Sequence, residues 1–296
     1  MKARYSVTLT LALVLVVACN RQEERAEAPS PPPSDSLTVV DSFRTPESVL
    51  YDATMDVYLV SNINGSPFDK DDNGFISRVG ADGRVVELHW LDGASDSVTL
   101  NAPKGMAIRG DTLYIADIDE VRMFDRTTGG PLGTLLTRRG AFLNDIGVGP
   151  DGNLYVTDTG LRPDFSAGPG GIFRFTARGR QWEAATGGPN GVVGDTGGTY
   201  VVVYWNGDVV RFGATRQAMP RPAGGQLDGV VRLADGTLLA SSWADSSIIR
   251  LAPGDTAWTR LYVGMPSPAD IGLDTRRSRV LIPILQGNRV EVRPAH

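Results

Sequence analysis

The sequence predicts an all-β protein, a six-bladed β-propeller with an N-terminal strand that closes the last blade. Glycine accounts for 35 of 296 residues, about 12% against a typical ~7%, and long apolar patterns with the helical period of 3.6 are absent. A short unit recurs instead: a polar residue after Pro or Leu, a strand, a tight turn and a second strand. It recurs about every 40–45 residues, which is the repeat length of a propeller blade.

The chain begins with a segment that we expect to lie outside the propeller. Lys2 and Arg4 are followed by an apolar or hydroxyl-bearing run of about twelve residues, 7–18, which is too short to span a bilayer and is typical of a signal peptide. The run ends at Cys19 in "VVAC", which resembles the bacterial lipoprotein signal, whose cysteine is acylated and becomes the first mature residue. The alternative is an ordinary signal peptide with an incidental cysteine.

These features predict three segments: a lipoprotein signal peptide over residues 1–18, a disordered tether over 19–35 and the propeller over 36–296. The tether is polar, charged and Pro-rich, so it cannot bury enough apolar area to fold. A lipid on Cys19 would hold the protein at a membrane of the bacterial cell envelope, facing the periplasm or the exterior, without crossing it.

Six copies of the strand unit follow. Their first polar positions, each after a Pro, a Leu or an equivalent residue, are Glu47, Lys104, Asn144, Asn190, Asp228 and, where an apolar residue takes the place, Ala269. The first interval is longer than the others because it contains an insertion around residues 63–74. A third strand is legible after most copies. The segment "SLTVVDSF" before the first copy has no blade of its own and is expected to close the sixth.

The composition excludes several classes of function. The formal net charge is −5 and no basic cluster stands out, so binding to a nucleic acid backbone is not expected. Cys19 is the only cysteine and the only histidines are His89 and His296. A Ser-His-Asp triad, a Cys-His pair and a His/Cys zinc site therefore lack their parts. Any metal must be held by oxygen, which points to a hard cation such as calcium or magnesium.

In a propeller the first strand of each blade is the innermost, so the six first polar positions converge on one mouth of the central channel. This ring contains two carboxylates, two carboxamides, one lysine and one alanine. Asp145 and Asp270 occupy the next position in their blades and are candidates for contact with a substrate. Asp117 and Asp158 end the second strands of blades two and three, where capping of a turn is the expected role.

Four ring motifs resemble those of the senescence-marker-protein, gluconolactonase and luciferin-regenerating-enzyme family: Glu47 in "PESVLYD", Asn144 in "LNDIGVGPDGNLY", Asn190 in "PNGVV" and Asp228 in "LDGVV". The resemblance covers roughly residues 40–293. It implies a six-bladed propeller with one divalent cation, often calcium, at the central mouth. The cation is held in the family by a glutamate of the first blade, asparagines of the third and fourth and an aspartate of the fifth, positions that Glu47, Asn144, Asn190 and Asp228 occupy.

The resemblance further implies a metal-dependent hydrolase of the lactonase or esterase type, acting on a small-molecule lactone or ester. The cation would polarise the carbonyl and acidify a water, while Asp228 would serve as ligand and general base. Asn144 or Asn190 is a candidate amide donor for the oxyanion. The competing interpretation is a non-catalytic propeller that binds a ligand or a protein, because this fold hosts many functions.

Two ring features depart from the family pattern. Sugar lactonases of the family usually carry an arginine two residues before the third-blade asparagine, and here that residue is Phe142, which favours a more apolar substrate. Lys104 has three interpretations: a contact for a substrate anion or oxyanion, an ion pair with Glu47, or an ammonium group in place of the metal. Trp205 and Trp243 end the second strands of blades four and five and are candidates for an apolar wall, with packing as the alternative.

One further motif lies in the insertion. "DKDDNGFIS" matches the first half of a calcium loop through Asp69, Asp71 and Asn73, which makes it a candidate second cation site. The acid expected at the twelfth position is missing, because that residue is Gly80, and the motif lies between strands rather than helices. A solvated hairpin loop is the alternative. In either case the loop is expected on the same face as the ring.

Overall fold

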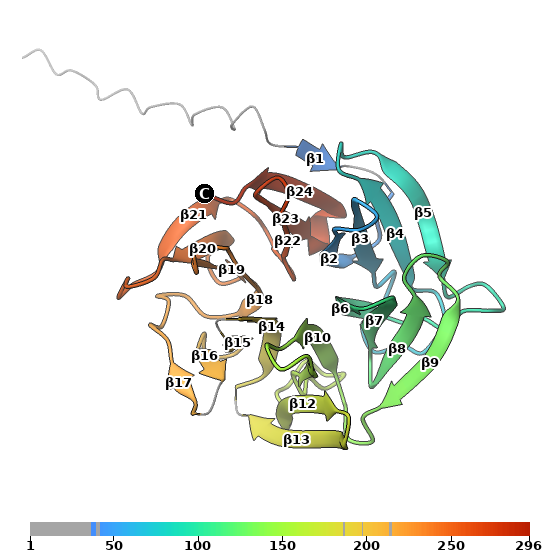
Figure 1. The fold of residues 1–296 in the computed structure, drawn as a ribbon, viewed down its shortest axis with the longest axis horizontal. Coiled ribbons are helices and arrows are strands. Elements are labelled where there is room, and N and C mark those ends of the chain that lie inside the picture. Colours follow the sequence, from blue (N-terminus) through green and yellow to red (C-terminus); the bar gives the residue numbers. More distant parts are fainter. Residues whose placement is uncertain (1–36, 40–41, 186, 197, 213–214) are drawn as a thin grey trace, which may run out of the picture. The chain divides into compact units, whose positions relative to one another are not determined.

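Six four-stranded antiparallel sheets are arranged around a central axis, as Figure 1 shows for the computed structural model. The structure describes residues 37–39, 42–185, 187–196, 198–212 and 215–296. The predicted signal peptide, Cys19 and the tether lie outside the described residues. Among the described residues a 3-10 turn, η1 (Leu285–Gly287), is the one helical element, and none is long and apolar enough to span a bilayer. The predicted six-bladed propeller is confirmed.

The blades follow one another along the chain. Blade 1 consists of β2 (Pro46–Asp52), β3 (Val57–Asn62), β4 (Phe75–Gly80) and β5 (Val85–Asp92). Blade 2 consists of β6 (Pro103–Arg109), β7 (Thr112–Asp117), β8 (Glu120–Asp125) and β9 (Pro131–Leu136). Blade 3 consists of β10 (Leu143–Val148), β11 (Leu154–Asp158), β12 (Gly170–Thr176) and β13 (Gly179–Ala185).

The second half repeats the pattern. Blade 4 consists of β14 (Pro189–Asp195), β15 (Gly198–Val203), β16 (Val209–Phe212) and β17 (Gln217–Ala218). Blade 5 consists of β18 (Leu227–Arg232), β19 (Leu238–Ser242), β20 (Ser247–Leu251) and β21 (Thr259–Val263). Blade 6 consists of β22 (Gly272–Asp274), β23 (Arg279–Ile284), β24 (Arg289–Pro294) and, as its outer strand, β1 (Leu37–Val39).

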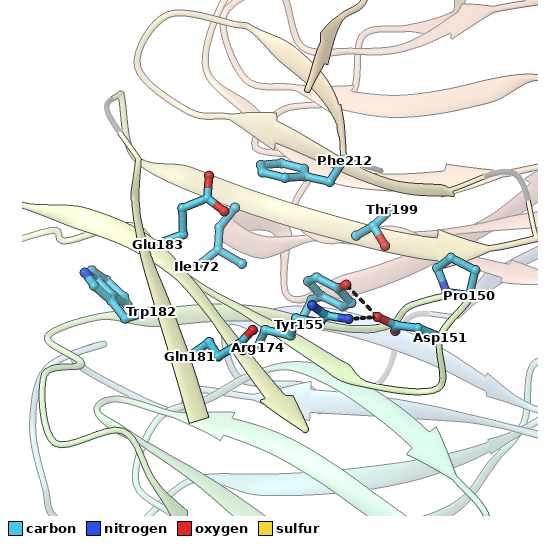
Figure 2. Close-up of a pocket in the computed structure, with 10 residues that line it drawn as sticks. All are labelled: Pro150, Asp151, Tyr155, Ile172, Arg174, Gln181, Trp182, Glu183, Thr199 and Phe212. Carbon is cyan, nitrogen blue, oxygen red and sulfur yellow. Dashed lines mark hydrogen bonds and ion pairs between the residues drawn. The ribbon is translucent and has the colours of Figure 1, made fainter. Parts of the chain in front are cut away.

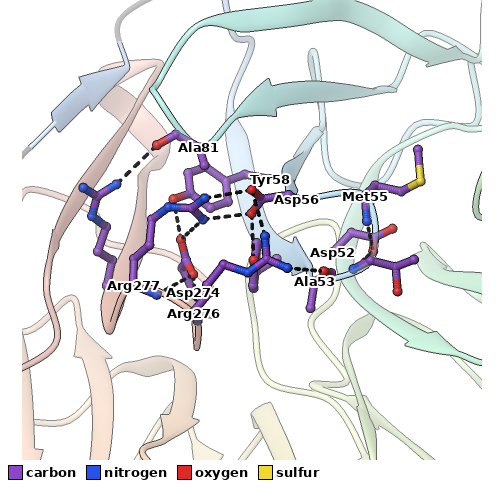
Figure 3. Close-up of polar contacts among 12 residues, drawn as sticks. Asp52, Ala53, Met55, Asp56, Tyr58, Ala81, Asp274, Arg276 and Arg277 are labelled. Atoms are coloured by element: carbon purple, nitrogen blue, oxygen red, sulfur yellow. Dashed lines mark hydrogen bonds and ion pairs between the residues drawn. The ribbon is translucent and has the colours of Figure 1, made fainter.

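The ring of blades is closed by the N-terminal strand, as predicted. β1 pairs with β24 in antiparallel register, with Leu37 opposite Val292. Blades 6 and 1 are also joined by polar contacts between the turns that follow their inner strands (Figure 3). The Arg277 guanidinium donates to Asp56 at 2.8 Å and to Asp274 at 3.0 Å, and Tyr58 donates to Asp274 at 2.8 Å. The N-terminal strand β1 thus completes the sheet that is formed by the C-terminal strands β22, β23 and β24.

The hydrophobic core lies in layers between neighbouring blades. Between blades 2 and 3, for example, Tyr114 and Val121 pack with Ile146, Val156 and Phe173. The second strands of blades 1, 2 and 5 are covered on both faces, so their residues are buried almost throughout rather than alternately. His89 lies on the outer strand β5, where it is half exposed and stacked on Phe75.

A β-bulge interrupts the pairing of the first and second strands in each of blades 1 to 5, at the ring position. In blade 3 the register shifts between Leu143 and Ile146, and the other blades shift at the equivalent residues. A bulge inserts one unpaired residue and redirects the side chains around it. The residue after the ring position is then forced close to the next blade: a Cβ atom at Gly105 would lie 2.3 Å from Asp145 Oδ1. Glycine at position 105 therefore allows the inner strands of blades 2 and 3 to lie this close together.

Candidate functional site

The five polar ring residues line one pocket at the mouth of the central channel. Glu47, Lys104, Asn144, Asn190 and Asp228 each occupy the second position of an inner strand, β2, β6, β10, β14 and β18. Each is buried, with no more than 6% of its surface exposed. Ala269, the sixth member, is fully buried. The pocket has a volume of about 570 Å³, within the usual range for small-molecule sites.

Four buried oxygen atoms of this ring have no hydrogen-bond partner. They are Glu47 Oε2, Asn144 Oδ1, Asn190 Oδ1 and Asp228 Oδ1. A buried polar atom without a partner costs about 1–3 kcal/mol, so several in one place require an explanation. All four are hard oxygen acceptors, and all four belong to the residues that the sequence selected as ligands of a divalent cation. The donor set is two carboxylates and two carboxamides, a suitable set for calcium.

The orientation of Asn144 is fixed by Thr159, a residue that the sequence analysis did not identify. The Thr159 hydroxyl donates to the Pro189 carbonyl at 2.9 Å, so its oxygen is left to accept from Asn144 Nδ2 at 3.0 Å. With the amide nitrogen engaged, Asn144 Oδ1 is the atom left over for the ring. The sequence signal was present but weak: Thr159 directly follows Asp158 at the end of β11.

Buried hydroxyl groups hold the bulged backbone in two blades. Thr157 Oγ1 accepts from the amide of Asp145 at 2.9 Å and donates to the carbonyl of Asn190 in the next blade at 2.5 Å. Ser241 makes the same pair of contacts, to the amide of Gly229 and the carbonyl of Ala269, each at 2.8 Å. Each hydroxyl therefore links the ring segments of two neighbouring blades and fixes their spacing.

The turns that lead into the inner strands are held by side chains at the ends of the second strands. Asp117 accepts from the amides of Asn101 and Ala102, and Asp158 accepts from those of Ala141 and Phe142. Both residues have the capping role that the sequence predicted, and they hold the chain just before Lys104 and Asn144. The ring is thus supported by a second layer of fixed backbone.

The electrostatics of the ring reflect crowding of buried carboxyl groups. Burial and, secondarily, the nearby Asp228 and Asp270 raise the pKa of Glu47 well above its usual value. Burial and the neighbouring Asp270 raise the pKa of Asp228 to about 8, although Trp243 and Asn190 act in the opposite direction. Trp243 Nε1 nevertheless makes no hydrogen bond of normal geometry. The protein alone therefore disfavours the ionised state of this ring, whereas a cation would favour it.

Lys104 donates its hydrogen bonds to backbone carbonyls and not to the four unpartnered oxygens, although the nearby Glu47 carboxyl group acts on its charge. Its ammonium donates to the carbonyls of Ala102 at 3.1 Å and Pro67 at 3.5 Å, and it lies 4.4 Å from the centre of the Phe142 ring. Among the described ion pairs, none joins Lys104 to Glu47, so the ion-pair interpretation is not what the structure shows. Nor does the ammonium bond to the other ring oxygens. Burial lowers the pKa of Lys104.

Asp145 and Asp270, the two candidates for substrate contact next to the ring, do not line the pocket. Both lie between neighbouring inner strands, Asp145 at the bulge of blade 3 and Asp270 at an isolated bridge to Ser48 of blade 1. Asp145 accepts from the amide of Val192 in blade 4 at 2.6 Å, and Asp270 accepts from Ser48 Oγ in blade 1 at 2.5 Å. Both carboxyl groups thus connect adjacent blades behind the ring, and burial raises the pKa of Asp270 to about 7.

Aromatic and aliphatic side chains form the walls of the pocket. Phe142, Trp205 and Trp243, selected from the sequence as candidate substrate contacts, all line it. The structure adds Leu161, Phe165, Tyr204 and Leu285 from the turns between second and third strands, which sequence patterns could not assign to a common site. The insertion also contributes Ile63, Gly65 and Pro67, so it lies on the ring face as expected.

The acidic part of the insertion is organised as a solvated turn. Asp69 and Asp71 are exposed, and the Asn73 amide donates to Asp71 Oδ2 at 2.6 Å. Neither Asp69, Asp71 nor Asn73 lines the pocket. Among the described residues, no group of three or more Asp, Glu, His or Cys side chains is arranged to hold a metal ion, here or elsewhere. The ring is not a group of this kind, because two of its four oxygen donors belong to the amide side chains of Asn144 and Asn190.

A second cavity, of about 560 Å³, lies between blades 3 and 4 and away from the ring (Figure 2). At its edge Asp151 accepts from Tyr155 Oη at 3.0 Å and pairs with Arg174. Burial opposes ionisation of Asp151, but these and other hydrogen bonds outweigh it and lower its pKa to about 2. This carboxylate is already satisfied by protein groups, and the cavity contains none of the predicted site residues.

Comparisons with known proteins bear on the fold. No protein-family model and no curated protein sequence matches the chain. Among solved structures, a gluconolactonase-family protein is 15% identical over 88% of this chain and 92% of its own, with a TM-score of 0.66. Luciferin-regenerating enzyme is 10% identical over 87% and 94% (TM-score 0.64). Virginiamycin B lyase from Staphylococcus aureus is 14% identical over 87% and 97% (TM-score 0.61). At these identities the similarity shows a common fold.

Proposed function

We propose that the protein is a divalent-metal-dependent hydrolase of the lactonase or esterase type, with calcium as the first candidate cation. One observation carries the proposal: the four buried oxygens without partners belong to Glu47, Asn144, Asn190 and Asp228. These are the four residues that the ring motifs select, and they come from four different blades. Two of the structures similar in fold, the gluconolactonase-family protein and luciferin-regenerating enzyme, are named as enzymes and support a hydrolase-type assignment.

The donor set fits a hard cation. Two carboxylates and two amide oxygens supply a charge of −2 and four ligands, and they leave coordination positions for water and substrate. Such a cation supplies Lewis-acid polarisation of an ester or lactone carbonyl and acidification of a water. It would also satisfy the four oxygens and offset the repulsion between the Glu47 and Asp228 carboxyl groups, the two effects that the protein alone leaves uncompensated.

The chain's own groups have separable roles in this proposal. Asp228, once ionised, accepts a proton from the attacking water, because burial and the nearby Asp270 raise its pKa and make it a stronger base than an ordinary carboxylate. Thr159 keeps Asn144 in the orientation that presents its oxygen. Trp243 Nε1, a buried donor without a partner, is available to a developing oxyanion. The apolar walls exclude bulk water from the carbonyl under attack.

Lyase chemistry of the kind seen in the third similar structure fits less well. A histidine-to-alanine variant of virginiamycin B lyase is described as catalytically inactive. In this chain His89 lies on the outer strand β5 and His296 is the last residue of the sequence, and neither lines the pocket. The walls and floor of the pocket therefore offer no imidazole for acid–base chemistry.

The experiment is a hydrolysis assay on simple lactones and aryl esters with calcium, with a chelator, and with calcium restored. The proposal expects activity that disappears with the chelator and returns with the cation. Activity that persists unchanged in the chelator would contradict a metal-dependent mechanism. If calcium binds at the ring but no lactone or ester is hydrolysed, the competing account of a ligand-binding propeller replaces this one.

A further inference from the structure

The pocket over the ring has a polar floor and apolar walls. Among the described residues, the charged groups are confined to the ring residues at the bottom, and Gln286 is the one amide side chain that lines the pocket outside the ring. Above them, the walls consist mainly of aromatic and aliphatic side chains from five blades. A ligand bound here would thus contact charged groups at one end and mainly apolar side chains along the rest of its surface.

One wall is an aromatic cluster from blades 4 and 5. The Tyr204 ring packs edge-on against Trp205, with ring centres 5.0 Å apart, and against Trp243, with ring centres 6.4 Å apart. Such edge-to-face pairs are favourable and hold the rings in defined orientations. Trp205 also rests on the backbone of Gly188, where a Cβ atom would lie 2.8 Å from the indole. The indole is therefore positioned before any ligand arrives.

The other wall is an aromatic cluster from blades 1 and 3. Phe68 of the insertion packs against Phe142, with ring centres 5.0 Å apart, and against Phe165, with ring centres 5.5 Å apart. Lys104 holds this wall in place through the face of Phe142 and the carbonyl of Pro67. The lysine in the ring thus serves the apolar wall in the observed structure.

Two large apolar side chains at the rim remain open to solvent. Phe165 is 64% exposed and Trp205 is 39% exposed, although both belong to the clusters that line the pocket. Exposed aromatic groups around a concave site mark a surface that gains free energy when a ligand covers it. Their exposure has no structural benefit to the free protein.

The walls offer little to a polyhydroxylated ligand. Besides the indole N–H groups, their side-chain hydrogen-bonding groups belong to Thr45, Thr159, Tyr204 and Gln286. The Thr159 hydroxyl is already used by Pro189 and Asn144. Most hydroxyl groups of a sugar lactone would lose their water contacts without finding new partners, at a cost for each unpaired group.

We propose that the substrates are lactones or esters with an apolar alkyl or aryl substituent, and that the two aromatic walls bind this substituent while the ring engages the carbonyl. This rests on the proposed function, because it assigns the substrate class of the same site. Burial of each methylene contributes about 0.8 kcal/mol, so kcat/KM should rise about fourfold per added methylene until the pocket is filled.

The test compares six-membered lactones that share one reacting group: δ-valerolactone, δ-octalactone, δ-decalactone and glucono-δ-lactone. The purified full-length protein with calcium is expected to prefer the longer alkyl lactones and to disfavour the sugar lactone. Trp205→Ala should flatten the dependence on chain length, and Trp205→Phe should preserve it. Leu132→Ala, which removes an exposed apolar side chain from the outer strand β9, is the matched control and should change nothing.

Equal or faster hydrolysis of glucono-δ-lactone, or rates independent of chain length, would overturn the proposal. A second measurement separates it from failure of the hydrolase assignment: calorimetric binding of alkyl-substituted δ-lactams, which resist hydrolysis. If no lactone is hydrolysed but lactam affinity rises with chain length and falls in Trp205→Ala, the apolar pocket is supported and the hydrolase is not. If neither hydrolysis nor lactam binding occurs, the proposal is wrong.

Discussion

The two ends of the propeller's inner strands carry acidic groups in opposite circumstances. At the end away from the ring, Asp56 and Asp274 are matched by Arg276 and Arg277 and by two tyrosine hydroxyls (Figure 3). At the ring, Glu47 and Asp228 have unpartnered oxygens, and the lysine among them bonds elsewhere. Opposite faces of the propeller therefore carry one acid cluster that the protein completes and one that it leaves incomplete.

The shifts in pKa follow this division. Hydrogen bonds from Arg277 lower the pKa of Asp56, whereas burial without a partner raises the pKa of Glu47 and Asp228. A cluster that already favours ionised carboxylates is explained by the closure of the propeller. A cluster that disfavours them has no such structural role, and the cation of the proposed function would account for it. A ligand is therefore expected at the buried carboxyl groups whose oxygens the fold leaves without hydrogen-bond partners.

The largest expected effect is a loss of hydrolytic activity in a variant of the ring, compared with a variant of the Asp56 and Asp274 cluster. Asp228→Asn removes a charged ligand and the general base together, so hydrolysis should fall by about 10³-fold or more. Asp274→Asn, at the satisfied cluster, should leave kcat/KM within about twofold of the wild type. The measurement is steady-state hydrolysis of the best lactone at saturating calcium. A fully active Asp228→Asn variant would break the comparison.

The same pair of variants should act in opposite directions on stability. Asp274→Asn weakens the hydrogen bonds that the buried Asp274 accepts from Arg277 and Tyr58, while Arg277 keeps its bonds to Asp56, and should destabilise the protein by about 2 kcal/mol. In calcium-free buffer, Asp228→Asn removes a crowded, unpaired carboxyl group and should be neutral or stabilising by about 1 kcal/mol. Denaturant unfolding in a chelator measures both. Destabilisation of similar size in both variants would show that the ring carboxylate already has an adequate partner within the protein.

Much of this comparison could be anticipated from the repeat. Because the repeat fixes which residue begins each inner strand, the ring of Glu47, Lys104, Asn144, Asn190 and Asp228 followed from spacing alone. The directions of the side chains did not follow. The bulge places Asp145 between the strands, and the insertion supplies the carbonyl of Pro67 that draws Lys104 toward Phe142. Of the walls, Phe142, Trp205 and Trp243 could be chosen from the repeat. Thr159 and the remaining wall residues come from turns without a repeated pattern, so only the fold assembles them.

Loss of the hydrogen bond that orients the Asn144 side chain should have an effect of intermediate size, on calcium affinity. Thr159→Val keeps the shape of the side chain but removes the hydroxyl that binds Asn144 Nδ2. The amide is then free to turn, so calcium affinity should fall about 10-fold, as expected for the loss of a group that orients a ligand. Thr159→Ser retains the hydroxyl and should restore affinity. Equal affinity in Thr159→Val and the wild type would show that Asn144 needs no such support.

The pH dependence of stability should distinguish the calcium-free from the calcium-loaded protein. The folded state raises the pKa of Asp228 to about 8 and of Asp270 to about 7, so it binds more protons than the unfolded chain. Stability from these groups is therefore present below the ordinary carboxyl pKa and is lost as the pH rises through about 7 to 8. The calcium-free Tm should fall over this interval, and calcium should flatten the fall. A Tm that rises with pH in the chelator would contradict the crowded ring.

The most direct test of the central claim, that the ring is incomplete without a cation, is calorimetric titration of the full-length protein with calcium. The wild type, an Asn144→Ala/Asp228→Ala variant of the ring and an Asp69→Asn/Asp71→Asn variant of the insertion should be compared. We predict one site that persists in the insertion variant and vanishes in the ring variant. Binding that survives in the ring variant, or no binding of calcium, magnesium, manganese or zinc by the wild type, would contradict the account.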